Sequence, residues 1–347
     1  MPLDAQVALV CDAPLSRRAE LLGLLPEPQD VIPRIPEAEL CFTVKAIGLA
    51  DSPWILEHAT PAQISTCIDL DAWSGTLPDR HALDSWIDTL AETNDEAFLR
   101  SVHALDPEML VLYLRGRVDV TLKPNDDDWQ PPEGAQTLEG QFYYAAHSAD
   151  DDLAAIGRLL RLLFEHDYWT YFRMMQGAIW ELDSDNEEWA LRWRNGRLED
   201  LGFPPWEEAM TIYATLRPSQ LAAIAEDARP LDIREWQLPV WIPQLPAASE
   251  SGPLVFRTIA QLADDERRAS LYAFIATANE VAVADRMPLG DAESTPRAIE
   301  KAAHWISAGL AFVASENGIE AVEVLRSVPL QRLFQVGANL NPEKART

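Results

Sequence analysis

The stretch EEWALRWRNGRLEDLGFPPWEEAMTIY, residues 187–213, predicts two helices joined by a sharp corner. Ser184 and Glu187 have the spacing of a capping box, in which a hydroxyl and a carboxylate pair with free amides, so we expect the first helix to begin at Ser184. Gly202 is expected to end it, because glycine adopts the left-handed conformation without a Cβ clash. Pro205 suits the first position of the second helix, since it has no N–H to leave unpaired.

Tryptophans and charged residues surround the first of these helices. Trp189 and Trp193 lie four residues apart, so they share a face with Arg197. In one interpretation an arginine stem covers an indole and its guanidinium pairs with a carboxylate, which locks the corner. In the other the arginines form a pocket for a carboxylate or phosphate ligand, although the acidity of the chain disfavours an anion. The candidate ligand residues are Trp189, Arg192, Trp193, Arg194, Arg197, Glu199 and Asp200.

The composition indicates an acidic globular protein. Its 347 residues suffice for one large domain or two ordinary ones, and 48% of them are hydrophobic against 24% charged. The 56 acidic and 28 basic residues give a formal charge of -28. Such a charge repels nucleic acid and anionic lipid, which are bound chiefly through clusters of lysine and arginine. We therefore expect neither nucleic acid nor a membrane among the partners.

The cysteines and the apolar runs favour a cytoplasmic location. Cys11, Cys41 and Cys67 are odd in number, lie in apolar surroundings and show no C-x-x-C spacing. We interpret them as small core residues in a reducing compartment. The chain has no signal-peptide pattern and no uncharged apolar run near the roughly 18 residues that span a bilayer.

The predicted fold class is mainly α. Residues 1–116 form a series of short helices, of superhelical character, and several helices start at a proline: Pro36, Pro53, Pro61 and Pro107. Proline fits the first helical turn and interrupts the helix before it. Thr60 and Gln63 add a capping-box spacing at one of these starts.

A small antiparallel β-hairpin insert is expected at residues 117–147. Val118, Val120 and Leu122 alternate with polar residues, which is typical of a half-buried strand. A tight hairpin is expected across residues 137–144, around Glu139 and Gly140.

The remainder is expected to be a C-terminal helical domain, residues 148–340, followed by a polar tail, residues 341–347. Its two longest helices, at 257–285 and 295–315, are predicted to form an antiparallel pair within a bundle. Asn317 and Gly318 are expected to end the second of them.

The sequence carries no common catalytic or cofactor motif. We find no G-x-G-x-x-G, P-loop, G-x-S-x-G or H-E-x-x-H, so no catalytic residue and no cofactor are assigned, and an enzyme is less expected than a binding protein. The acidic runs 126–128 and 150–152 suit loose Mg²⁺ binding, but loop solvation and helix N-terminal charge explain them equally, and no metal ligand is assigned. Tryptophans beside prolines are interface candidates, because indole is favoured at binding hot spots. They are Trp206, Trp236 and Trp241.

Four segments together carry a family resemblance: the 187–213 stretch, LFEHDYWTYFRMM before it, ANEVAVADRMPLGD after it and VPLQRLFQVGANL near the end. They resemble a bacterial family catalogued only as a domain of unknown function, so the resemblance implies no activity. The proline-started helices of the N-terminal part also look like the cytosolic N-terminal domain of MgtE-type magnesium transporters, in style rather than in motif.

Three functions follow as expectations. The first is a cytoplasmic scaffold or adaptor that binds another protein through a helical surface. The second is a ligand-sensing protein or enzyme with an arginine, tryptophan and carboxylate pocket. The third is a divalent-cation sensor that uses the acidic loops.

Overall fold

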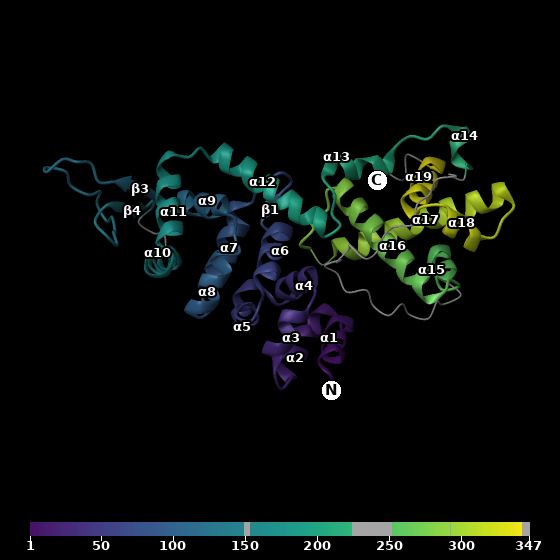
Figure 1. The fold of residues 1–347 in the computed structure, drawn as a ribbon, viewed down its shortest axis with the longest axis horizontal. Coiled ribbons are helices and arrows are strands. Elements are labelled where there is room, and N and C mark those ends of the chain that lie inside the picture. The colour runs from purple at the N-terminus through teal and green to yellow at the C-terminus, as the bar shows by residue number, and fades with distance from the viewer. Residues whose placement is uncertain (149–152, 224–251, 292, 342–347) are drawn as a thin grey trace. The chain divides into compact units, whose positions relative to one another are not determined.

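The chain forms two compact units. The computed structural model describes residues 1–148, 153–223, 252–291 and 293–341, and its units are Met1–Gly196 and Arg197–Thr347. Both are mainly helical (Figure 1). The boundaries expected at residues 116, 147 and 340 do not coincide with this division.

The first unit begins with a series of short helices, and the prolines start them as predicted. α5, α6 and α9 each begin at a proline, and α4 begins directly after Pro36. Thr60 and Gln63 form the predicted capping box at the start of α6. The α-helices are α1 (Leu3–Asp12), α2 (Leu15–Leu24), α3 (Pro28–Val31), α4 (Glu37–Ile47), α5 (Pro53–Leu56), α6 (Pro61–Asp71), α7 (Arg80–Leu90), α8 (Asp95–Val102), α9 (Pro107–Arg117), α10 (Ala154–His166), α11 (Tyr168–Trp180) and α12 (Asp183–Asp200).

These helices pack in sequence order. α2 packs on α4, α4 on α6, α7 on α9, and α9 on α11, so each helix buries its apolar face against one that follows. A buried ion pair holds the start of the series: Arg18 Nη1 lies 2.6 Å from Glu39 Oε2, and Arg18 Nη2 donates to the carbonyl of Cys11 at 2.7 Å. Both charges are thus paired, as burial in a low dielectric requires. Cys11, Cys41 and Cys67 are buried free thiols.

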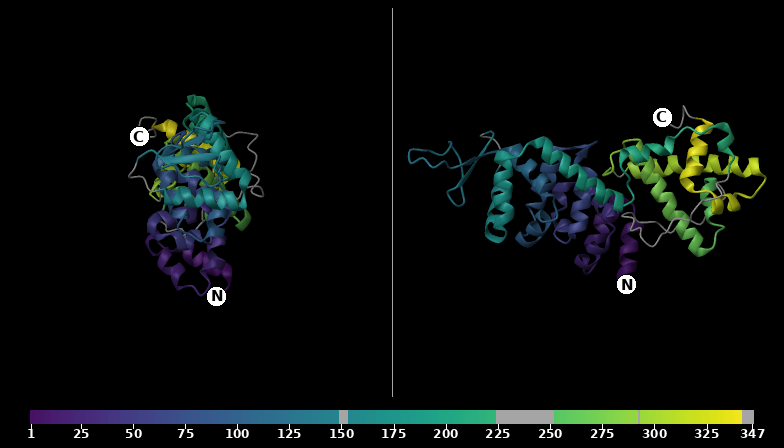
Figure 2. Two further views of the ribbon diagram at one scale, coloured as in Figure 1. Left: turned by 90° about the vertical axis from the view of Figure 1, so that its left-hand side faces the viewer. Right: turned by 45° about the horizontal axis from the view of Figure 1, so that its top comes forward.

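Two small antiparallel sheets interrupt the helices of the first unit. β3 (Val118–Leu122) pairs with β4 (Phe142–Ala146), and in the right-hand view of Figure 2 this hairpin extends away from α10 and α11. The hairpin expected within 137–144 is therefore wrong in its pairing: the second strand pairs with β3, and only a Gln136–Tyr144 bridge spans the turn. Gly140 does take a positive φ in that turn. A second pair, β1 (Trp73–Ser74) with β2 (Leu77–Pro78), was not predicted.

The predicted helix corner exists, with two corrections. α12 begins at Asp183, so Ser184 lies inside the helix rather than capping it, and the amides of Asp185 and Asn186 both donate to the carbonyl of Leu182. Gly202 has φ +81° after the helix end, as expected. Pro205 stands just before α13 rather than at its first position, and its carbonyl accepts the first helical hydrogen bonds.

The second unit is a helical bundle around α17. The helix expected over 257–285 is divided into α15 and α16 by residues 260–263, where the chain turns before the acidic first turn of α16. α17 packs against α15, α16, α18 and α19, and it ends at Gly318 in the left-handed conformation, as predicted. The described α-helices of the second unit are α13 (Trp206–Ala209), α14 (Pro218–Leu221), α15 (Leu254–Ile259), α16 (Asp264–Ala284), α17 (Ser294–Asn317), α18 (Ala321–Ser327) and α19 (Leu330–Leu340).

Short 3-10 helices complete the described elements: η1 (Ile32–Arg34), η2 (Leu49–Asp51) and η3 (Met210–Tyr213). Within the described ranges, no helix is both long and apolar enough to cross a membrane.

Two glycines set the crossing of α17 and α19. A Cβ built on Gly309 would lie 1.9 Å from the carbonyl oxygen of Leu333, and one built on Gly337 would lie 2.0 Å from that of Trp305. The neighbouring atoms are backbone, so a side chain cannot be accommodated by a change of rotamer. The bundle therefore depends on two hydrogen-sized side chains at this crossing.

Replacing either glycine is expected to destabilise the second unit. Gly309→Ala and Gly337→Ala force the two backbones apart, which costs on the order of 3 kcal/mol. Gly23→Ala is the matched control, because a Cβ there meets nothing within 4 Å. Urea unfolding followed by circular dichroism measures the three variants, and equal midpoints for Gly309→Ala and Gly23→Ala would contradict the close crossing.

A buried carboxyl in the second unit faces α19. Glu280 on α16 is 7% exposed, and Gln331 Nε2 donates to its Oε1 at 2.6 Å. Burial raises the pKa of Glu280 to about 7, opposed by the hydrogen bond from Gln331 and assisted by the charge of Glu208. The folded unit therefore binds this proton more tightly than the unfolded chain, whose value is 4.5.

We expect Glu280 to make stability fall as pH rises. Its contribution is complete below pH 4.5 and is lost as pH rises through about 7, a change of roughly 3 kcal/mol. Glu280→Gln should flatten the pH dependence and raise stability at pH 8, whereas Glu316→Gln, at an exposed site of α17, should not. Unfolding free energies at pH 5 and pH 8 test this, and an unchanged slope in Glu280→Gln would contradict it.

Candidate functional site

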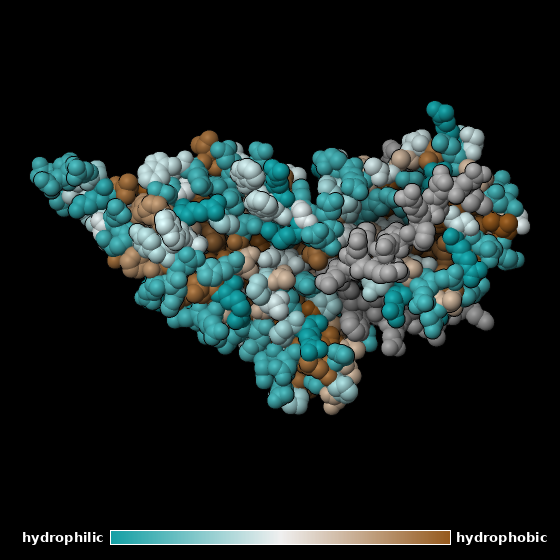
Figure 3. Space-filling model, in the orientation of Figure 1, coloured by the Kyte–Doolittle hydropathy of each residue, from teal (hydrophilic) through white to brown (hydrophobic). Residues whose placement is uncertain are grey.

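Four tryptophans of α11 and α12 are exposed, all within the first unit. Trp169 and Trp180 are 78% and 56% exposed, and Trp189 and Trp193 are 48% and 49% exposed. Trp169 and Trp180 lie eleven residues apart on α11, a spacing that returns to the same helix face. Leu182, at 63% exposure, lies between the two helices. We call these four exposed tryptophans and Leu182 the α11–α12 surface. Most of the face of the protein that Figure 3 shows is hydrophilic.

Trp189, Trp193 and Arg192 lie close together on α12. Trp189 and Trp193 stack with ring centroids 6.1 Å apart and an interplanar angle of 26°. The guanidinium of Arg192 lies 5.3 Å from the centroid of the Trp189 ring. This ring therefore already engages a cation on its π face.

A cavity of about 450 Å³ adjoins the two stacked indoles. This size is within the range of small-ligand sites. Three elements line it: α9 with one glutamate, α11 and its end with an arginine and a glutamate, and α12 with four side chains. The lining residues are Glu108, Arg173, Glu181, Asp185, Asn186, Trp189 and Trp193. Three carboxylates against one guanidinium make the cavity acidic.

Two buried side-chain atoms in this cavity have no hydrogen-bond partner among the described residues. Glu108, whose side chain is 12% exposed, accepts a hydrogen bond from Arg173 Nη2 on Oε1 at 2.8 Å, but its Oε2 is buried without a partner. Asn186 is 3% exposed, and its Nδ2 is buried without a partner. An unpaired buried polar group costs about 1–3 kcal/mol. A free acceptor and a free amide therefore lie beside two exposed indoles.

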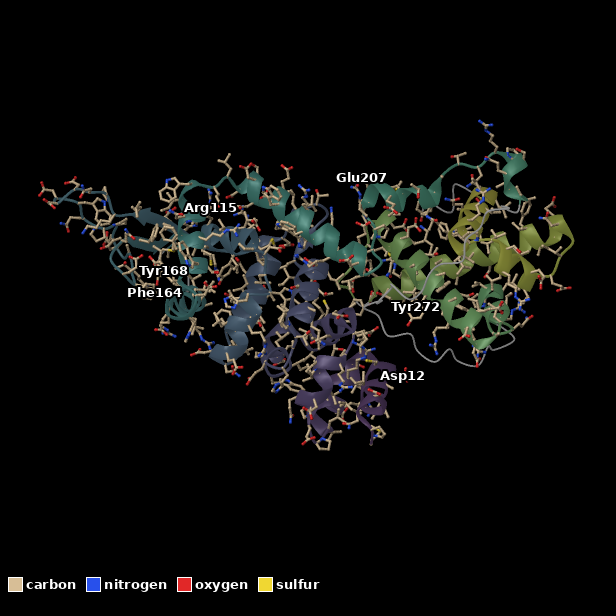
Figure 4. All side chains as sticks on the ribbon, viewed as in Figure 1. Asp12, Arg115, Phe164, Tyr168, Glu207 and Tyr272 are labelled. Carbon is tan, nitrogen blue, oxygen red and sulfur yellow. The ribbon has the colours of Figure 1, made fainter. Side chains whose placement is uncertain are left out.

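An ionic cluster around Asp183 positions these residues. Arg115 of α9 donates to the carbonyl of Glu181, where α11 ends, and its Nε lies 3.0 Å from Asp183 Oδ1. Arg80 of α7 lies 2.7 Å from Asp183 Oδ2 and 3.6 Å from Glu187 Oε1. Figure 4 shows Arg115 where α9 passes α11. The start of α12 is thereby tied to α7 and α9, which fixes Trp189 and Trp193 over the cavity.

A close contact seats α11 on α9. A Cβ on Gly177 would lie 2.8 Å from Val111 and 2.9 Å from Glu181 Oε2, so glycine allows the two helices to approach. The other end of α11 is held by aromatic packing. Phe164 and Tyr168 are seen together in Figure 4 at the turn between α10 and α11, and their ring centroids lie 5.8 Å apart.

The other predicted arginine and carboxylate residues do not line this cavity. Arg194 donates from Nε to the carbonyl of Asp69 at 2.7 Å and lies 4.8 Å from the centroid of Trp73, so it packs α12 against α6. Arg197, Glu199 and Asp200 belong to the second unit, and both carboxylates are exposed. The structure therefore brings Trp189, Trp193 and Arg192 together, and it places Arg194 against α6.

Of the three interface candidates beside prolines, Trp206 lies within the described residues. Trp206 is partly buried in the second unit with the guanidinium of Arg286 lying 4.5 Å from its centroid, and its Nε1 is buried without a partner among the described residues. Trp236 and Trp241 lie outside the described residues.

Sequence reasoning missed most of the cavity. Glu108 and Arg173 lie 65 residues apart, and no local pattern predicts that they meet. Asn186 lies three residues before Trp189 and seven before Trp193, so it shares their helix face. An asparagine at such a position carries no specific functional signal. Trp169 and Trp180 had one usable signal, since their spacing places two tryptophans on one face of α11.

A cluster of ionisable residues in the second unit is internally satisfied. In the second unit, Tyr213 donates to Asp285 Oδ1 and Lys301 Nζ binds Asp285 Oδ2, each at 2.8 Å. Within the part of the chain that the structure describes, no group of three or more His, Cys, Asp or Glu side chains is placed to hold a metal ion. The acidic run 126–128 is included in that statement, whereas residues 150–152 lie outside the described ranges.

Comparison with known proteins identifies a family whose function is unknown. The model of a family of unknown function, DUF6178, matches residues 1–343, which includes parts of both units. No curated protein and no solved structure matches the chain. The function of the site has to be inferred from its own geometry.

Removing the Asp183 cluster is expected to loosen the start of α12. Asp183→Asn keeps the shape of the side chain but removes the charge that pairs with Arg80 and Arg115, and the loss is about 1–2 kcal/mol because the pairs are partly exposed. Asp185→Asn, two residues further along and exposed, is the control. Hydrogen exchange of α12 amides checks the result, and equal protection in both variants would contradict it.

Proposed function

The chain belongs to DUF6178, a family of unknown function, and we propose from its geometry that it is an adaptor that binds another protein through the α11–α12 surface. The observation that carries the proposal is the exposure of Trp169, Trp180, Trp189 and Trp193. Large aromatic side chains are usually buried, and an exposed group of them marks an interaction site.

The energetics of indole support a protein partner. A tryptophan side chain buries about 150–250 Å² when covered, and the covered apolar area contributes about 25 cal/mol per Å². Four half-exposed indoles therefore form a surface that gains several kcal/mol from a matching partner. Tryptophan is also among the residues that dominate binding energy at interfaces. The ionic fixation of α12 reduces the conformational entropy that binding would cost.

A ligand-sensing protein is the second candidate. It is favoured by the cavity of about 450 Å³ and by the unpaired polar atoms of Glu108 and Asn186 inside it. A divalent-cation sensor, with the likeness to MgtE-type transporters, stays a prediction without support from the described residues. A cytoplasmic location is likewise part of the proposal and rests on the buried free thiols.

The adaptor function is tested by comparing tryptophan variants in partner capture. Trp169→Ala combined with Trp180→Ala should reduce recovery of a reproducible partner at least tenfold, because two interface indoles are lost. Trp54→Ala, at a tryptophan that is 38% exposed on α5, is the matched control and should leave recovery unchanged. Quantitative mass spectrometry of cross-linked complexes gives the measurement. Equal recovery of the partner by the two variants would overturn the proposal. The absence of a reproducible partner for the unsubstituted protein would overturn it as well.

A further inference from the structure

We propose that the cavity beneath Trp189 and Trp193 binds the guanidinium of an arginine side chain from the partner protein. This inference rests on the proposed adaptor function and names the chemistry that the same surface recognises. It begins from the cavity, which joins an acidic lining to two exposed indole rings.

The charge of the lining selects a cation. Glu108, Glu181 and Asp185 face only one guanidinium, that of Arg173, which is already paired with Glu108 Oε1 at 2.8 Å. An anionic ligand would meet three carboxylates in a chain of net charge -28. A cation is attracted by both the local and the overall charge.

The free carboxylate oxygen of Glu108 selects a group that donates hydrogen bonds. Glu108 Oε2 is a buried carboxylate oxygen with no partner among the described residues, so an incoming N–H would satisfy it. Asn186 is 3% exposed and also lines the cavity with an unpaired amide. A guanidinium has five N–H donors in one plane, so it can donate to more than one carboxylate oxygen of the lining at once.

The aromatic rings select a flat cation. Guanidinium stacks on indole faces as well as pairing with carboxylates, which ammonium does less effectively. Arg192 already shows this contact on the same ring system, at 5.3 Å from the centroid of Trp189. The Arg173 guanidinium, in turn, shows that Glu108 accepts this group. The stacking of a guanidinium on indole and its pairing with Glu108 therefore each have an example at the site.

The test uses small probes on the purified full chain, so it does not require the partner. Acetyl-arginine methylamide is titrated while the indole N–H signals of Trp189 and Trp193 are followed by NMR, and the citrulline analogue serves as its neutral isostere. The arginine probe should shift both signals saturably, and the citrulline probe should bind about tenfold more weakly, since a charged hydrogen bond is lost. Equal binding of citrulline, equal binding of the lysine analogue, or tighter binding of an acetyl-glutamate probe would each overturn the proposal.

Matched variants locate the binding. Glu108→Gln should weaken the arginine probe about tenfold, and Asp185→Asn should weaken it less, because that carboxylate is exposed. Glu188→Gln, an exposed glutamate of α12 that does not line the cavity, should have no effect. Circular dichroism shows whether each variant is folded. If Glu108→Gln does not fold, Asp185→Asn still tests the site. An arginine probe that binds equally to all three variants overturns the assignment of this cavity.

The outcomes separate this inference from the adaptor function. If the partner is captured through Trp169 and Trp180 but the arginine probe does not bind, the guanidinium site is wrong and the adaptor function stands. If the probe binds but no partner is captured, the cavity recognises a guanidinium and the adaptor function is wrong.

Discussion

The pairing of Asp183 with two arginines is the constraint on which the site depends. Asp183 is the first residue of α12, and Arg80 and Arg115 reach it from α7 and α9. Arg115 also donates to the carbonyl of Glu181, the residue that follows α11, so one side chain joins three helices. Without these contacts the start of α12 would be held only by its own hydrogen bonds, and helix ends fray. The position of the stacked indoles over Glu108 follows from this fixation.

The exposed tryptophans have an energetic cost. Apolar area left in water forgoes about 25 cal/mol per Å² of stabilisation and invites association. The second unit shows the opposite use of its side chains: Gly309 and Gly337 bring α17 and α19 together so closely that backbone meets backbone, and large residues such as Phe334 are buried around them. The chain therefore has the means to bury its aromatic residues, and the α11–α12 surface is an exception to that pattern.

The sequence predicted those features of the fold that short-range chemistry controls. Proline at helix starts, the Thr60 capping box and the left-handed Gly318 were correct, because each depends on residues within one helical turn. Errors arose where distant residues decide the outcome. α12 begins before Ser184 because Asp183 is held by Arg80, which is 103 residues away. β4 pairs along its whole length with β3 and makes one bridge to the residues just before it. The site was predicted only in part for the same reason: Trp189, Trp193 and Arg192 are neighbours on one helix, whereas Glu108 comes from α9.

Oxidative footprinting of tryptophan in living cells tests the central claim most directly, because it compares the same side chains with and without the partners that the cell supplies. The account predicts that Trp169, Trp180, Trp189 and Trp193 are labelled in the purified protein and protected in cells, while Trp54 is labelled to the same extent in both. Equal labelling of all five tryptophans in the two settings would show that the α11–α12 surface is uncovered in the cell, and would contradict the account.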